Sequence, residues 1–230
     1  YVPELSDSGF NDVRIAHILQ MSSGIDFSEE YAGTESDAYK IFNRLFLYMQ
    51  PLDRVTASYG SKNKAGTKFY YSSLNTQALT MLLREVYQQD LSKTLEEKIW
   101  HPMGMSDDAY WSTDLYGTEL GFMSLNATAR DFAKLGLIFL NKGEYQGRKI
   151  VSEDWVDKAL TPDKKFLQRG QIYGDWGYQY QWWLPRSSTN DFAAIGIWGQ
   201  IIYVNPDANT VIVKTSIDEN FKPHEFEAIQ

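Results

Sequence analysis

The pattern of apolar residues changes near residue 170, and this change limits the folds that the chain can adopt. Before it, segments such as 75–87 and 132–140 repeat apolar residues at the spacing of amphipathic helices. After it, the chain is rich in β-branched and aromatic residues, which predicts strands at 177–185, 192–206 and 210–216. Helices followed by an antiparallel sheet indicate an α+β fold.

Capping signals support the helices of the first part. Thr128 and Asp131 match a capping box ahead of the helix at 132–140, and Ser152 is placed to cap the helix that follows it. The sequence NPDAN at 205–209 predicts a hairpin turn between the last two strands. Further helices are expected at 13–21 and 36–49.

We expect one structural domain, with a mainly helical lobe at 1–165. Residues 166–230 are expected to supply antiparallel strands and, from 221–229, the start of a C-terminal helix. Three strands make a thin sheet, and the strand at 210–216 keeps an unpaired edge unless other strands cover it. The chain also starts at Tyr1 without a Met or an apolar leader. We therefore expect further strands of the same fold to precede residue 1 in a longer protein.

Composition argues against several classes of function. The formal charge of −8 disfavours nucleic acid or an anionic membrane as a partner, because both require a basic surface. The absence of cysteine excludes a disulfide framework and a thiolate zinc site. No apolar run approaches the roughly 20 residues that cross a bilayer. The histidines show no metal-binding spacing and are interpreted as surface or packing residues: His17, His101 and His224.

Three features could carry chemistry, and each has a plainer explanation. The aromatic run at 174–183 could stack on sugar rings, but aromatic residues on strands are more often core residues. The acidic pairs at 29–30 and 107–108 are interpreted as solvated groups, since nothing singles out a catalytic pair. The one Ser-x-x-Lys match, at 61–64, has polar flanks with glycine, whereas a lysine-activated serine opens a buried helix. We interpret it as a loop.

The segment KFYYSSLNTQAL at 68–79 places two tyrosines beside two serines just before a helix. Together with other stretches in the same order, it resembles the serine β-lactamase-like superfamily. That superfamily contains class C β-lactamases, DD-peptidases, related esterases and 6-aminohexanoate-dimer hydrolases. The resemblance covers nearly the whole chain and implies a β-lactamase-like fold. The stretches that carry it are 12–27, 65–86, 95–111, 126–156 and 196–216.

The resemblance implies that Tyr71 is a catalytic tyrosine. The family pattern is Phe-x-Tyr-Ser before an apolar helix, which fits Tyr71 and leaves Tyr70 as a packing residue. A free phenol has a pKa of about 10, but a neighbouring lysine ammonium favours the phenolate, which can then accept the nucleophile's proton. Ser73 stands where many members carry an asparagine that contacts the substrate amide, so Ser73 is the implied substrate-binding residue there.

The resemblance implies a second site segment at 197–200. Ile197 stands where relatives carry Lys or His, Trp198 at the middle position and Gly199 at the glycine, which lets substrate approach closely. The backbone amide of Gln200 is the implied oxyanion-hole donor. Because Ile197 lacks the cation that would hold a penicillin or peptide carboxylate, an uncharged amide or ester is favoured. Trp198 would add an apolar wall to the cleft.

The family's nucleophile, the serine of Ser-x-x-Lys, lies upstream of the segment that this chain begins with. We therefore expect a serine hydrolase that cleaves an amide or ester through an acyl-enzyme, with residues 1–230 alone nearly inactive, since losing the nucleophile costs roughly 10⁶ in kcat.

Two alternatives remain: a penicillin-recognising DD-peptidase or β-lactamase, and a catalytically inactive module that binds a glycan or peptidoglycan. No metal or organic cofactor is implied. The expected partners are a small amide, ester or peptide-like substrate and the missing N-terminal segment. The resemblance favours a periplasmic or secreted location and leaves the cytoplasm open.

Overall fold

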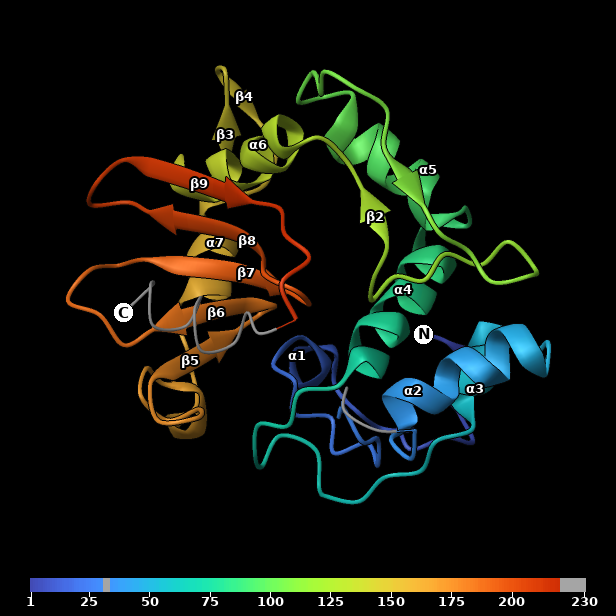
Figure 1. The fold of residues 1–230 in the computed structure, drawn as a ribbon. Coiled ribbons are helices and arrows are strands. Elements are labelled where there is room, and N and C mark those ends of the chain that lie inside the picture. The colour runs from blue at the N-terminus through green and yellow to red at the C-terminus, as the bar shows by residue number, and fades with distance from the viewer. Residues whose placement is uncertain (31–33, 220–230) are drawn as a thin grey trace. The chain divides into compact units, whose positions relative to one another are not determined.

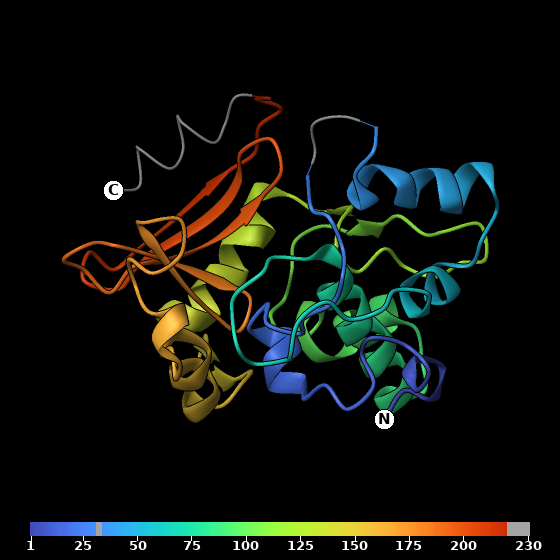
Figure 2. The same cartoon turned by 90° about the horizontal axis from the view of Figure 1, so that it is seen from below.

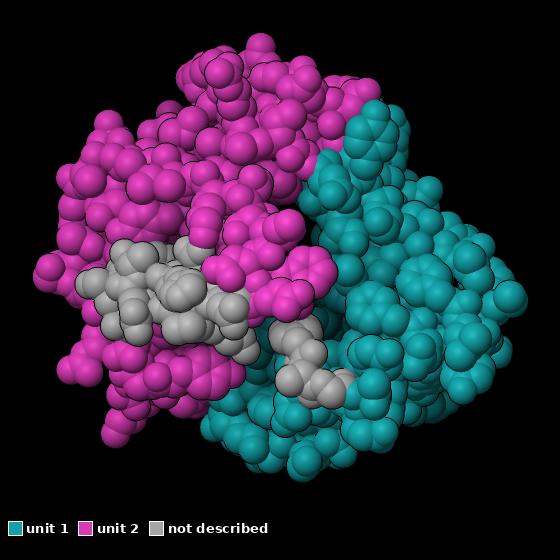
Figure 3. All heavy atoms as spheres, in the orientation of Figure 1, with its two compact units in different colours: residues 1–97, 110–126 teal, residues 98–109, 127–230 magenta. Residues whose placement is uncertain are grey.

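The structure is a computed structural model that describes residues 1–30 and 34–219. The chain divides into two compact units (Figure 3). The first unit consists of residues 1–97 and 110–126, and the second of residues 98–109 and 127–230. The expected start of a C-terminal helix at 221–229 lies outside the described residues, and the expected division of the chain at residue 165 stays a prediction.

The first unit is mainly helical and is built around one long helix, α4 (Ser73–Tyr87). Leu74, Ala78 and Met81 lie on one face of α4 and are buried, whereas Val86, which the periodicity places on one apolar face with Ala78, is 58% exposed. This face joins a core that includes Ile18 and Val55. The other elements of the unit are η1 (Pro3–Leu5), α1 (Ile15–Leu19), α2 (Asp37–Phe42), η2 (Asn43–Leu47), α3 (Leu52–Ala57), α5 (Leu91–Leu95), β1 (Tyr110–Trp111) and β2 (Leu125–Asn126), while η3 (Glu96–Trp100) runs from the first unit into the second.

The second unit is an antiparallel sheet covered by helices (Figure 1). Its five strands lie in chain order and each pairs with the next. The strands are β5 (Trp176–Gln179), β6 (Trp182–Pro185), β7 (Phe192–Gly196), β8 (Gln200–Asn205) and β9 (Thr210–Lys214). The remaining elements are α6 (Ala129–Leu140), β3 (Glu144–Tyr145), β4 (Arg148–Lys149), α7 (Glu153–Leu160) and η4 (Lys165–Leu167).

The number of strands predicted in this region is wrong, because two of the expected strands fold back on themselves. Residues 177–185 form the hairpin β5–β6, with a two-residue turn at Tyr180 and Gln181. Both turn residues have positive φ, of 37° and 72°, as tight hairpin turns of the primed types require. Residues 192–206 likewise form the hairpin β7–β8. The predicted turn within 205–209 is confirmed, since Asn205 pairs with Thr210.

Helices α6 and α7 pack on the sheet, and their apolar side chains form the core of the second unit together with those of the strands (Figures 1 and 2). Gly136 allows α6 to approach closely, because a Cβ at this position would lie 2.7 Å from Cγ1 of Val211 on β9. Four aromatic side chains of the run at 174–183 are buried, with at most 8% of their surface exposed: Trp176, Tyr178, Trp182 and Trp183. These residues therefore form core rather than an exposed stacking platform.

Strand β9 has the unpaired edge that was expected for the strand at 210–216. Within residues 1–30 and 34–219, β9 pairs with β8 alone. Ile212 on β9 is 54% exposed. In the same residues, none of the helices combines the length and the apolar character needed to span a membrane.

Both predicted helix caps are confirmed. The hydroxyl oxygen of Thr128 accepts a hydrogen bond from the Asp131 N–H at 3.2 Å, and that of Ser152 accepts one from the Trp155 N–H at 3.1 Å. Asp131 is fully buried and also accepts hydrogen bonds from the Ser106 N–H at 2.8 Å and the Lys134 ammonium at 2.9 Å. Asp131 therefore ties the start of α6 to the loop that precedes it in the second unit.

Candidate functional site

Tyr71 lies in the first unit, two residues before α4, in a short stretch that is fixed at both ends. On one side, the N–H of Tyr70 donates to the carbonyl oxygen of Met21 at 2.7 Å. On the other side, Ser73 begins α4 and hydrogen bonds to Glu29. The side chain of Tyr71 is half-buried. Tyr70 was expected to be a packing residue, but its side chain is 44% exposed and does not belong to the core.

Glu29 holds the first residue of α4 through two contacts. Its Oε2 accepts from the Ser73 N–H at 2.8 Å, and its Oε1 accepts from the Ser73 hydroxyl at 2.5 Å. The interpretation of Glu29 as a solvated surface group is therefore wrong, whereas its neighbour Glu30 is exposed. No local pattern in the sequence pairs Glu29 with a residue 44 positions away.

The contact with Glu29 determines which hydrogen bonds Ser73 can offer to a substrate. A serine hydroxyl has one proton, and the Ser73 hydroxyl donates it to Glu29. Its remaining lone pairs can accept a hydrogen bond, such as one from an amide N–H. The predicted contact of Ser73 with a substrate amide would thus use Ser73 as the acceptor.

The second predicted segment lies in the second unit, at the turn that joins β7 to β8. Trp198 and Gly199 have positive φ, of 62° and 81°. Trp198 is 48% exposed and Ile197 is 37% exposed. Residues 197–199 fall within the strand predicted at 192–206, but the structure places them in the turn between β7 and β8. Positive φ is unusual for a bulky residue and marks this turn as a strained position.

Gln200, the first residue of β8, has its side chain occupied within the second unit. Its amide nitrogen Nε2 donates to the carbonyl oxygen of Ser216, and its Oε1 accepts from the Ser216 N–H at 3.3 Å. The carbonyl oxygen of Trp198 accepts from the N–H of Asp218 at 3.2 Å. These contacts fix the 197–200 turn against the segment that follows β9. The role predicted for Gln200 uses its backbone amide and does not require the side chain.

The predicted residues thus form two groups. Tyr71 and Ser73 lie at the N-terminus of α4 in the first unit, and residues 197–200 lie in the hairpin β7–β8 of the second unit. Ser61, from the Ser-x-x-Lys match, lies in an exposed loop and forms an isolated bridge with Ile25. It does not open a helix, as the interpretation of this match as a loop predicts.

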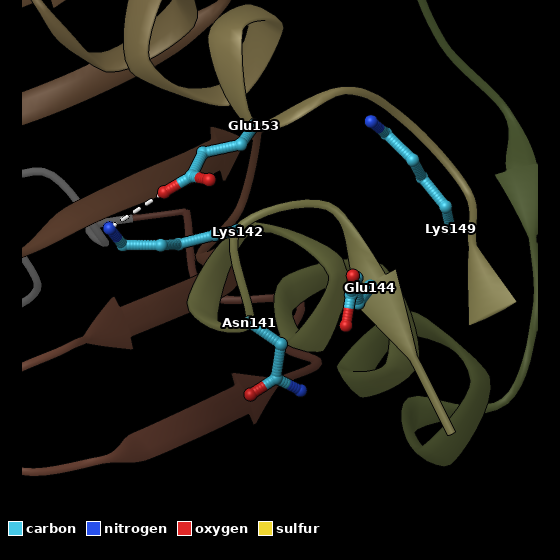
Figure 4. Close-up of a pocket in the computed structure, with 5 residues that line it drawn as sticks. All are labelled: Asn141, Lys142, Glu144, Lys149 and Glu153. Carbon is cyan, nitrogen blue, oxygen red and sulfur yellow. Dashed lines mark hydrogen bonds and ion pairs between the residues drawn. The ribbon is translucent and has the colours of Figure 1, made fainter. Parts of the chain in front are cut away.

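A surface pocket in the second unit contains none of the predicted residues (Figure 4). Its lining includes an ion pair between Lys142 and Glu153, with Nζ and Oε1 2.9 Å apart and both side chains mostly exposed. The other lining residues are Asn141, Glu144 and Lys149. Figure 4 shows that Lys149 lies apart from this ion pair, so the lining forms no converging set of catalytic groups.

The family model described as Beta-lactamase matches residues 1–228. The chain is 26% identical over 226 residues to the 6-aminohexanoate-dimer hydrolase of Paenarthrobacter ureafaciens, and the match covers 94% of this chain and 57% of that protein.

Solved structures share the fold. A Bacillus anthracis protein provisionally named a 6-aminohexanoate-dimer hydrolase has a TM-score of 0.87 and 24% identity, over 100% of this chain and 62% of that one. A penicillin-binding protein from Bacillus halodurans has a TM-score of 0.68 and 19% identity, over 96% of this chain and 75% of that one. The chain therefore spans about three fifths of the first two relatives. These similarities confirm the predicted β-lactamase-like α+β fold.

Proposed function

The chain belongs to the Beta-lactamase family of hydrolases, and we propose that its full-length protein is a serine hydrolase that cleaves an amide or ester through an acyl-enzyme. The observation that carries the proposal is the stretch Tyr71–Ser73, which matches the family's tyrosine motif and is fixed at both ends. A side chain that exchanges protons with a nucleophile has to be held in one place.

In the proposed reaction, the serine of a Ser-x-x-Lys segment attacks the carbonyl carbon of the substrate. The phenolate of Tyr71 accepts the proton of that serine, and the substrate oxygen gains negative charge in the tetrahedral intermediate. The backbone N–H of Gln200 and the N–H of the nucleophile stabilise this charge. Tyr71 then returns the proton to the leaving amine or alcohol, and water hydrolyses the acyl-enzyme.

The nucleophile is proposed to come from polypeptide other than residues 1–230. The one Ser-x-x-Lys match in these residues lies in an exposed loop rather than at the start of a buried helix. Relatives that are longer than this chain leave room for such a segment.

Ile197 supports an uncharged substrate over a penicillin. A β-lactam or peptide carboxylate needs a cation, and Ile197 occupies the position at which relatives carry Lys or His. We therefore propose short uncharged amides and esters as substrates. The 6-aminohexanoate dimer, for which the similar Paenarthrobacter ureafaciens protein is named, is the charged amide to compare with them, because its linear form has a free carboxylate that would find no cation at position 197.

A fluorophosphonate probe tests the proposal, because it reacts covalently with activated serines. We expect intact mass spectrometry of the full-length protein to show one adduct, which peptide mapping places on the serine of a Ser-x-x-Lys segment outside residues 1–230. An unlabelled protein, or an adduct on Ser61, would contradict the assignment. Ser61→Ala is the matched control, and we expect it to be labelled to the same extent as the wild-type protein.

Trp198→Asn should weaken binding of substrates with apolar acyl chains. In the proposed site, removing the half-exposed indole of Trp198 loses about 1–2 kcal/mol of apolar contact with the acyl chain, which corresponds to a KM about tenfold higher for p-nitrophenyl butyrate. The KM for p-nitrophenyl acetate should change less. Asparagine tolerates positive φ, so relief of strain should offset the lost packing and leave the melting temperature nearly unchanged.

Tyr173→Asn is the matched control for this variant. Tyr173 is also an aromatic residue of the second unit with positive φ, of 52°, and is 72% exposed, but it lies outside the proposed site. We expect its substitution to leave both KM values unchanged. An equal rise of KM for butyrate and acetate in Trp198→Asn would contradict a role for Trp198 as an acyl-chain wall.

A further inference from the structure

We propose that Glu29 is a positioning residue for catalysis, because its carboxylate fixes the path of the chain between Tyr71 and α4. The inference rests on the proposed function, in which Tyr71 transfers the proton. Glu29 lies in the segment after the bridge residue Ile25, far in sequence from the helix that it contacts. Its role would be to determine where the Tyr71 hydroxyl lies relative to the substrate.

The contact has the geometry of a strong, directional anchor. Two oxygens of one carboxylate accept from two donors of one residue, the N–H and the hydroxyl of Ser73, at 2.8 and 2.5 Å. Hydrogen bonds to an ionised acceptor are shorter and stronger than those between neutral groups. Two parallel bonds also restrict rotation of the chain about either one of them.

The start of α4 depends on this contact because the usual cap is absent. Ser72 occupies the N-cap position with an extended backbone, at φ −152° and ψ 124°, yet its side chain makes no capping hydrogen bond. The Ser72 hydroxyl is fully buried and has no hydrogen-bond partner among the described residues. The carboxylate of Glu29 replaces the missing cap and also places a negative charge at the positive end of a 15-residue helix.

The two anchors leave little freedom to the catalytic tyrosine. The Tyr70 N–H is held by the carbonyl oxygen of Met21, which is itself completely buried and has a positive φ of 51°. Only Tyr71 and Ser72 lie between this anchor and Ser73. Loss of the Glu29 contact would therefore release one end of a stretch that is otherwise rigid. A displacement of about 1 Å at a reacting group is enough to lower kcat by up to about 10²-fold.

Kinetics of the full-length protein with p-nitrophenyl acetate test this role. Glu29→Gln retains the size of the side chain but has a single oxygen and an NH₂ group that cannot accept. We expect kcat to fall about tenfold with KM changed less than twofold, at temperatures at which the variant is fully folded. Glu30→Gln, an equal change at the exposed neighbouring position, should have wild-type kcat and KM.

Variants of Ser73 give a second measurement that does not depend on the folding of Glu29→Gln. Ser73→Ala removes the hydroxyl contact and should lower kcat, while Ser73→Thr restores a hydroxyl and should recover most of the activity. In a double-mutant cycle of Glu29→Ala and Ser73→Ala, the two effects on kcat should be strongly non-additive, because the hydroxyl bond that Ser73→Ala removes is one of the two bonds that Glu29→Ala already removes. Additive effects would overturn the inference.

The outcomes also separate this inference from the proposed function. If Tyr71→Phe loses activity and Glu29→Gln keeps wild-type kcat, the positioning role is wrong and the proposed function stands. A higher KM with unchanged kcat in Glu29→Gln would mean that Glu29 acts on substrate binding, which also overturns the positioning role. If Tyr71→Phe keeps full activity, the proposed function fails, and the inference fails with it.

Discussion

Tyr71→Phe should lower the turnover of the full-length protein by at least about 10²-fold while the fold stays intact. The substitution removes the one group that is proposed to carry a proton between the nucleophile and the leaving group, and such proton transfer contributes about 10²–10⁴-fold. The phenyl ring keeps the packing of the half-buried side chain. The anchors at Tyr70 and Ser73 use atoms that the substitution does not touch.

Steady-state kinetics with p-nitrophenyl acetate and with a short amide measure this effect. Tyr70→Phe is the matched control, because it removes the same hydroxyl from the adjacent, 44% exposed tyrosine and should leave kcat unchanged. The amide should suffer more than the ester, since an amine leaving group needs protonation and p-nitrophenolate does not. Near-wild-type hydrolysis of both substrates by Tyr71→Phe would rule out the assignment.

Most of the fold could be predicted from the sequence because local signals and burial agree. The helix α4 and the caps at Thr128 and Ser152 lie where the pattern indicates, although the buried face of α4 differs from the predicted one, since Val86 is exposed. The turns of the β5–β6 and β7–β8 hairpins were not predicted, for a physical reason. Tyr180 and Gln181 adopt positive φ without the glycine or asparagine that usually marks such turns, and Trp198 adopts it beside Gly199. Bulky residues are retained in this conformation only when tertiary contacts outweigh the local strain, and local sequence does not reveal those contacts.

The candidate site was predictable only where a motif is contiguous. Tyr71 and Ser73 are two positions apart and fall within one family pattern, so the resemblance locates them. Glu29 and Glu30 are adjacent and chemically identical, yet one is tied to Ser73 and the other is exposed. The difference arises from the way in which the segment before α2 passes the start of α4. That path is a property of the folded chain and has no counterpart in the composition of residues 29–30.

Asp131→Asn should reduce the free energy of unfolding by about 3 kcal/mol at pH 7. Asp131 is fully buried, and its carboxylate accepts hydrogen bonds from the Ser106 N–H, the Thr128 hydroxyl and the Lys134 ammonium. An asparagine turns one of these acceptor oxygens into an NH₂ group that faces other donors. It also leaves the partly buried Lys134 ammonium without its counter-charge, and breaking a buried pair in this way costs about 3–5 kcal/mol.

The pKa of Asp131 gives this prediction a signature in pH. Burial raises the pKa, but hydrogen bonds from Lys134, the Ser106 N–H, Thr128 and the Asp107 N–H outweigh it and lower the pKa from 3.8 to about 2. This difference corresponds to roughly 2 kcal/mol, at about 1.36 kcal/mol per pH unit. A group whose folded pKa is depressed stabilises the fold above its unfolded pKa. The contribution of Asp131 is therefore complete above about pH 4 and is lost as the pH falls through about 2.

Urea unfolding of wild-type protein and Asp131→Asn across this pH range measures both effects. Tryptophan fluorescence is a suitable probe, because six of the seven tryptophans belong to the second unit, which contains Asp131. The gap in stability between the two proteins should be widest at neutral pH and should narrow by about 2 kcal/mol as the pH approaches 2.

Asp154→Asn is the control variant: comparing its destabilisation with that of Asp131→Asn separates the effect of a buried ion pair from that of an exposed one. Asp154 also lies in the first turn of a helix and pairs with a lysine, Lys158, at 2.7 Å, but its side chain is 76% exposed. Water screens such a pair, so its loss should cost less than about 0.5 kcal/mol. If the two variants were equally destabilised, or if the gap for Asp131→Asn did not change with pH, the carboxylate of Asp131 would not be the anchor that its hydrogen bonds indicate. The start of α6 would then depend on apolar packing against the sheet rather than on this buried charge.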